Sequence, residues 1–208
     1  NHITSIEDAP LHDGDWLVLA RTNDKLTKLK PILKDMAIYF EIKDRKSYKT
    51  RLYTAVKHYT RWAKGDKLSL SECKDLFEYL ELEQELKEER MYDLKEFNYS
   101  IEDQWYEVFK SDPEECLYIR EMLRNKEELS KPARVKLSTI HAAKGGEATN
   151  VLLILDNTKK IREAIERSED KYDEEQRVWY VGVTRTKQNL YILTAKYEDK
   201  GYDIESLG

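Results

Sequence analysis

The sequence of 208 residues predicts an α/β fold with a mainly parallel sheet and an inserted helical subdomain. The first observation is that short strand-like runs alternate with helical stretches near both ends of the chain, an order typical of parallel sheets. The second is a helical pattern over residues 47–130. With 40% hydrophobic and 37% charged residues, the chain can form a core beneath a heavily charged surface. We therefore expect one α/β domain, built from residues 1–46 and 131–208, with a helical insertion over residues 47–130.

The first part of the predicted domain contains two strands and one helix. Residues 16–20, WLVLA, form a continuous apolar run that suits a strand buried on both faces. Residues 21–24 supply cap-forming side chains, and apolar residues then continue at helical spacing as far as Met36. Because Pro31 lies inside this pattern, we expect a kink or a later helix start. The second strand is expected over residues 38–42.

The predicted insertion is broken at Gly65, with further boundaries expected at residues 98–100 and 111–113. Four bulky side chains fall close to one face of its first helix: Tyr53, Val56, Tyr59 and Trp62. Aromatic side chains between lysines and arginines can stack on nucleic-acid bases. Such a face more often packs into a core, and we favour the core.

The last part of the chain returns to strands. Strand patterns cover residues 134–140, 150–155 and 189–195, and helical patterns cover residues 158–167 and 173–183. Strands separated by helices at both ends of the chain indicate a single parallel sheet.

Composition excludes several classes of protein. Cys73 and Cys116 are far apart and lack metal-ligand spacing, so we expect free thiols in a reducing compartment, the cytoplasm. The sequence contains no run of about 18 apolar residues, so it predicts no membrane-spanning helix. The first residues lack the order of a secretory signal, and the chain begins at Asn1. We therefore expect a piece of a longer polypeptide.

The net charge of −5 is distributed unevenly. Residues 21–64 hold thirteen Lys or Arg against four Asp or Glu, whereas residues 65–130 hold nine against twenty. A basic segment can bind a phosphate backbone, although lysine-rich helix faces are more often simply solvated. Charge alone therefore leaves nucleic-acid binding open.

The most specific motif is VKLSTIHAAKGGEATNV, at residues 135–151. It runs from a predicted strand into a loop of small residues, and in an α/β sheet ligands gather where strands end. We expect His141, Lys144 and Glu147 just past that strand end. Gly145 and Gly146 permit a close approach of the backbone to a phosphate, and Lys144 adds positive charge.

A second motif, WYVGVTRTKQNLYIL, covers residues 179–193. Its helical part ends near Thr184, which places Arg185 at the helix exit. A rigidly held arginine presents a planar set of donors that matches phosphate oxygens. The alternative is an arginine paired with a carboxylate such as Asp173 or Glu174.

Together these residues resemble the C-terminal RecA-like core domain, a P-loop-NTPase-type fold, of superfamily 1 DNA helicases of the UvrD/Rep/PcrA type. Residues 138–147 look like that family's motif V, and residues 173–193 look like its motif VI. Residues 16–24 are similar to the segment that opens the same domain. Residues 47–130 lie where the family carries an inserted helical subdomain.

The resemblance implies roles for individual residues. Arg185 would reach the γ-phosphate of ATP, Glu147 would contact the ribose, and Lys144 would couple the nucleotide site to DNA. Four residues would lie along single-stranded DNA: Arg21, Asn23, Thr139 and His141. The family usually has leucine and a bulky aromatic residue on either side of the glutamate, where this chain has Gly146 and Ala148.

The sequence contains no GxxxxGK[ST] phosphate loop and no apolar strand that ends in paired acidic residues. ATP with Mg²⁺ would therefore be bound mainly by an upstream motor domain of the same polypeptide, and this chain alone is expected to be inactive. We expect an ATP-dependent DNA helicase that translocates on single-stranded DNA. The alternatives are a non-catalytic helicase-like scaffold or protein-interaction module, and a motor fused to a nuclease.

Overall fold

A computed structural model of the chain describes residues 1–194, except 83, 85, 98, 100, 102 and 144. Contacts between residues divide the chain into two compact units. The sheet unit combines residues 1–47 with the residues from 127 onward, and the helical unit consists of residues 48–126. The helical unit is therefore a single insertion into the sequence of the sheet unit.

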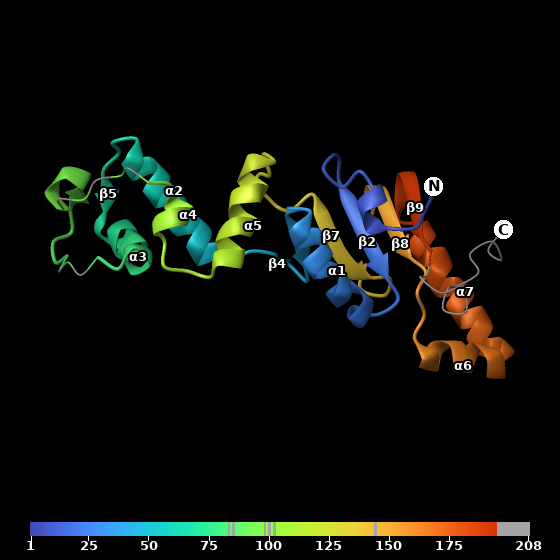
Figure 1. The fold of residues 1–208 in the computed structure, drawn as a ribbon. Coiled ribbons are helices and arrows are strands. Elements are labelled where there is room, and N and C mark those ends of the chain that lie inside the picture. The colour runs from blue at the N-terminus through green and yellow to red at the C-terminus, as the bar shows by residue number, and fades with distance from the viewer. Residues whose placement is uncertain are drawn as a thin grey trace. The chain divides into compact units, whose positions relative to one another are not determined.

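A sheet of seven strands forms the centre of the sheet unit in the described part of the chain. Its order is β1–β9–β8–β2–β7–β3–β4, and all neighbouring strands are parallel except β3 and β4. The strands have these bounds: β1 His2–Ile3, β2 Trp16–Ala20, β3 Phe40–Ile42, β4 Arg45–Lys46, β7 Val135–Thr139, β8 Ala148–Ile154 and β9 Thr186–Leu193. In Figure 1 the blue strand β2 lies beside β7 and β8, which come from the other end of the sequence. The predicted α/β class with a mainly parallel sheet is confirmed.

Strand β2 lies at the centre of the sheet, and all five of its residues are buried. A strand covered on both faces needs apolar side chains at every position, which explains the unbroken run WLVLA. Trp16 and Val18 belong to one core cluster, whereas Leu17 and Leu19 belong to another. Because successive side chains of a strand point to opposite faces, the two clusters mark the two faces of the sheet.

Helix α1 (Asn23–Asp35) covers the first face. Three of its leucines are buried there: Leu26, Leu29 and Leu33. Pro31 lies inside α1, so the expectation of a later helix start is wrong. Proline removes one backbone donor from the helix, but the buried leucines on both sides of Pro31 hold this segment against the sheet.

Helix α7 (Glu169–Val183) covers the second face together with the loop between β7 and β8. Trp179 is fully buried and shares a cluster with Ile140 and Ala143 of that loop. A Cβ atom on Gly182 would lie 3.0 Å from Cδ1 of Leu153. The absence of a side chain at Gly182 therefore allows α7 to approach the sheet closely.

Substitution of Gly182 by valine is expected to destabilise the sheet unit by about 1–3 kcal/mol, because the added methyl groups would overlap Leu153. Urea denaturation followed by circular dichroism measures this loss. Gly146→Ala is the control, since its Cβ would lie 3.4 Å from the nearest atom, the carbonyl oxygen of Ala143. Equal stability of Gly182→Val and the unsubstituted chain would contradict the close approach.

The helical unit has an aromatic core. Its elements have these bounds: α2 Thr50–Ala63, β5 Leu68–Ser69, α3 Leu70–Leu80, β6 Met91–Tyr92, η2 Leu94–Phe97, α4 Trp105–Val108 and α5 Pro113–Arg124. Trp62 of α2 is fully buried, and its ring centroid lies 5.7 Å from that of Phe77 and 5.6 Å from that of Phe97. Val56 and Tyr59 are buried on the same helix face. The interpretation of this face as core is therefore confirmed for these three residues, whereas Tyr53 is only half-buried. The antiparallel pair β5–β6 was not expected.

Several predicted boundaries differ from the observed ones by a few residues. Strand β3 begins at Phe40 rather than residue 38, and β9 begins at Thr186 rather than residue 189. The boundary expected at residues 111–113 is confirmed, because Asp112 caps α5 by accepting the N–H of Glu114. The boundary at residues 98–100 falls partly on residues outside the described set.

Both cysteines are free and buried, as expected. Burial raises the pKa of the Cys73 thiol to about 11, and burial also raises the pKa of Cys116. Neither thiol is therefore a reactive thiolate near neutral pH. Among the helices of the described residues, none has the length and apolar character of a membrane span.

Candidate functional site

The carboxyl edge of the sheet, where the parallel strands end, gathers four of the predicted site residues. Ala20 at the end of β2 pairs with Thr139 at the end of β7. Arg21 directly follows the first of these residues, and His141 comes shortly after the second. Asn23 is exposed and is the first residue of α1. The structure therefore brings the predicted DNA-binding residues to one edge.

Arg21 is held at this edge by Glu175 of α7. Its Nε donates to the two carboxylate oxygens at 2.8 and 3.1 Å, and its Nη2 donates to Oε1 at 2.6 Å. The pair is largely shielded from solvent, with side-chain exposures of 20% for Arg21 and 10% for Glu175. The Nη1 atom lies 3.4 Å from Nδ1 of His141. Sequence reasoning missed Glu175, which is 154 residues away in the chain.

Thr139 closes the turn that follows β7. Its hydroxyl oxygen accepts the N–H of Ala142 at 3.3 Å, and its carbonyl accepts the N–H of Ala143 at 3.0 Å. A hydroxyl that accepts one hydrogen bond still has a proton to donate. His141 in the same turn is exposed. Both side chains can therefore donate to a ligand at this edge.

The loop between β7 and β8 carries the first motif from one edge of the sheet to the other. Strand β7 ends at the carboxyl edge, whereas Ala148 begins β8 at the amino edge. Parallel strands require this, because each connection must return to the edge where strands begin. Glu147 therefore lies at the amino edge, and the expectation that it lies with His141 just past the strand end is wrong. Lys144, between them, lies outside the described residues.

Glu147 and Arg185 are neighbours at the amino edge. Ala148 pairs with Thr186 in the register of β8 and β9. The N–H of Ala148 donates to the carbonyl oxygen of Arg185 at 3.1 Å. The two residues predicted to contact the nucleotide thus precede a pair of hydrogen-bonded strands, and their backbones lie side by side.

The Arg185 side chain is fixed by the end of α7. Its Nε donates to the carbonyl oxygen of Val181 at 3.1 Å, and its Nη2 donates to Oγ1 of Thr184 at 3.3 Å. No carboxylate of a described residue forms an ion pair with it, and Glu174 pairs with Lys171 at 2.6 Å instead. Arg185 is half-buried. Its charge therefore remains available to an anionic ligand.

Lys187 adds a second cation to the amino edge, and sequence reasoning missed it. Its Nζ lies 3.8 Å from Oε2 of Glu147. Lys187 is the second residue of β9, and Arg185 lies in the turn just before that strand, so both cations lie near the amino edge. The pKa of Asp15 is lowered mainly by hydrogen bonds from Thr149, with a further contribution from Lys187. The edge therefore combines two cations with two carboxylates.

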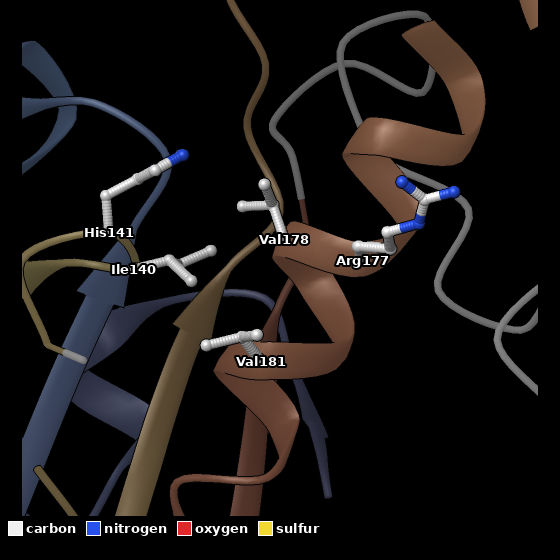
Figure 2. A pocket seen from close by; sticks show the side chains of 5 residues that line it. All are labelled: Ile140, His141, Arg177, Val178 and Val181. Atoms are coloured by element: carbon white, nitrogen blue, oxygen red, sulfur yellow. The ribbon is translucent and has the colours of Figure 1, made fainter. Parts of the chain in front are cut away.

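A cavity of about 190 Å³ lies between the start of the β7–β8 loop and α7 (Figure 2). Ile140 points across it toward Val178 and Val181 of the helix. His141 stands above Ile140, and Arg177 of α7 also lines the cavity. Ile140, Val178 and Val181 make an apolar wall, which His141 and Arg177 border, so this cavity suits contact with a partly apolar group.

Two comparisons bear on the chain as a whole. Residues 18–197 match the sequence model of the UvrD-like helicase C-terminal domain. The chain is also similar to the ATP-dependent DNA helicase PcrA of Bacillus subtilis (strain 168), with 32% identity over 108 residues. This alignment covers 49% of the chain and 14% of the relative, so the matched segment is a small part of that protein.

Proposed function

The chain belongs to the UvrD-like helicase C-terminal domain family, and on this basis we propose that it is the C-terminal motor domain of an ATP-dependent DNA helicase that translocates on single-stranded DNA. One observation carries the proposal. The residues predicted to bind DNA lie at the carboxyl edge of the sheet, and Glu147 and Arg185, which are predicted to bind nucleotide, lie at the amino edge. One rigid sheet therefore connects the two proposed binding surfaces.

The amino edge is the proposed wall of an ATP site. Arg185 is fixed by backbone and hydroxyl acceptors that leave its charge uncompensated, which suits a γ-phosphate. Glu147 is exposed and is proposed to accept a hydrogen bond from the ribose. Lys144 is proposed to couple this site to DNA. The Mg²⁺ ligands and the rest of the ATP site belong, in this proposal, to an upstream motor domain.

The carboxyl edge is the proposed path of single-stranded DNA. Four side chains are proposed to contact the sugar-phosphate backbone: Arg21, Asn23, Thr139 and His141. Such contacts position a strand without selecting its sequence, as a translocating motor requires.

Two segments join the edges and are proposed to couple ATP hydrolysis to movement. The β7–β8 loop begins beside Thr139 and ends at Glu147. Helix α7 contacts Arg21 through Glu175, continues for about 12 Å to its end at Val183, and leads to Arg185 two residues farther on. A shift of either segment would therefore change both the contacts to DNA and the position of Arg185 relative to the γ-phosphate.

The chain is expected to bind a fluorescein-labelled oligo(dT) weakly at low salt, and fluorescence anisotropy measures this binding. The logarithm of the binding constant should fall linearly with the logarithm of salt concentration, by about 0.7 for each phosphate neutralised. His141→Ala should weaken binding because it removes a donor at the carboxyl edge. His12→Ala is the matched control, since His12 is an exposed histidine in the loop that precedes β2.

Absence of binding at low salt would rule out the DNA surface of this chain and favour the non-catalytic scaffold. Equal loss of affinity in His141→Ala and His12→Ala would move the DNA surface away from the carboxyl edge.

A further inference from the structure

In its present position, the Arg21 guanidinium cannot donate hydrogen bonds to both the Glu175 carboxylate and a DNA phosphate. Its Nε and Nη2 atoms are both directed at the carboxylate of Glu175. The remaining nitrogen, Nη1, faces His141. A phosphate that binds the guanidinium in a bidentate manner must therefore displace the carboxylate.

The Arg21–Glu175 pair forms part of the wall of a second cavity, of about 220 Å³, beside helix α6 (Lys159–Arg167). Helices α6 and α7 pack against each other in the sheet unit (Figure 1). The charged residues of the wall are Arg21, Lys160, Lys171, Glu174 and Glu175, and its apolar residues are Ile161, Ala164 and Ile165. The cavity thus gives a ligand access to the ion pair.

The charges of this wall favour an anion. It contains three cations and two carboxylates, and Lys171 already pairs with Glu174 at 2.6 Å. Lys160 is exposed on the side of α6 that lines the cavity. One added negative charge would bring the net charge of the wall to zero, and a phosphodiester carries one negative charge.

We propose that this cavity is a phosphate site for single-stranded DNA, in which a phosphodiester replaces the Glu175 carboxylate as the hydrogen-bond partner of Arg21. The inference rests on the proposed function and adds Lys160 and Glu175 to it. Glu175 is a positioning residue that holds Arg21 at the carboxyl edge while DNA is absent. When Arg21 turns to the phosphate, α7 loses this ion pair with the β2–α1 loop. DNA binding and the position of α7 are thereby linked.

Glu175 has a second cation within reach when Arg21 leaves it. The pKa of Lys171 is raised chiefly by its hydrogen bond to Glu174, and the charge of Glu175 contributes to the same shift. Since a buried carboxylate without a partner is costly, a nearby ammonium group makes the exchange feasible. The released carboxylate therefore does not remain uncompensated.

The test uses Glu175→Gln, which removes the competing charge and nearly preserves the shape of the side chain. Anisotropy with oligo(dT) should show affinity higher by roughly three- to tenfold at low salt, because the phosphate no longer competes with a carboxylate for Arg21. Glu163→Gln is the control for net charge, because Glu163 pairs with Lys159 and Arg167 and does not line the cavity. It should raise affinity much less than Glu175→Gln does.

Two further variants separate competition from a general electrostatic effect. In the background of Arg21→Gln, the substitution Glu175→Gln should no longer raise affinity, because no arginine is released. Lys160→Gln should lower affinity, whereas Lys159→Gln, next to it in sequence but outside the cavity wall, should have little effect. Equal behaviour of the two lysine variants would overturn the site.

The resonance of the Arg21 Nε–H group in the unsubstituted chain gives a measurement that does not depend on a variant folding. It can be assigned with Arg21→Lys and should shift during titration with oligo(dT). If oligo(dT) binds while this resonance stays in place, or if Glu175→Gln binds with the original affinity, the exchange is overturned and the proposed DNA surface survives. If no oligo(dT) binds at low salt, the DNA surface fails and this inference fails with it.

Discussion

Substitution of Arg185 by alanine is expected to lower ATP turnover of the intact protein by about 10³–10⁵-fold and to leave its affinity for single-stranded DNA almost unchanged. The physical reason for the first effect is that the guanidinium is proposed to stabilise charge on the transferring phosphoryl group. The reason for the second is position, since Arg185 precedes β9 at the amino edge and the proposed DNA contacts lie at the carboxyl edge. Phosphate release with saturating oligo(dT) measures the first, and anisotropy measures the second.

Two control substitutions make the Arg185 result specific. Arg167→Ala removes an exposed arginine at the end of α6 and should leave turnover unchanged. Arg185→Lys keeps the charge but loses the planar set of donors, so it should recover only part of the activity. Near-normal DNA-stimulated turnover in Arg185→Ala would contradict the proposed role. An equal loss of DNA binding would instead indicate that Arg185 is structural.

Most of the sheet could be predicted because its strands are marked in the local sequence by runs of apolar residues. Strand β2 is buried on both faces, so its five residues are all apolar and its bounds match the prediction. Helices α6 and α7 were expected from the periodicity of their apolar residues. The short strand β1 was not expected, because two residues that pair with β9 carry no pattern of their own.

The arrangement of the candidate site could be predicted only in part, because side-chain partners depend on which strands become neighbours. The order of the strands, with β2 between β7 and β8, is a result of packing and cannot be derived from local sequence. That order places Glu175 beside Arg21. The position of Glu147 at the edge opposite to His141 follows instead from the parallel connection between β7 and β8. The residue types that carry the chemistry were therefore recognisable, and the division between two edges was implied by the predicted parallel sheet, whereas the partner of Arg21 was not.

Trp179→Ala is expected to destabilise the sheet unit by about 3–5 kcal/mol. Trp179 is fully buried between α7 and the sheet, in the same cluster as Leu153 and Ile140. Its removal leaves a cavity of indole size that the neighbouring strands cannot fill, since their backbones are fixed by sheet hydrogen bonds. A urea titration followed by circular dichroism should show a lower midpoint with an unchanged slope.

Tyr180→Ala is the matched control for Trp179→Ala, because Tyr180 is the next residue of the same helix and is 61% exposed. Both substitutions replace a large aromatic residue by the best helix former, so their effects on helix propensity are nearly equal. The stability of Tyr180→Ala should change by less than about 0.5 kcal/mol. A similar loss in both variants would mean that α7 is not held to the sheet by Trp179. In that case the placement of Arg185 would have to depend on the Arg21–Glu175 pair and on the hydrogen bond between Ala148 and Arg185.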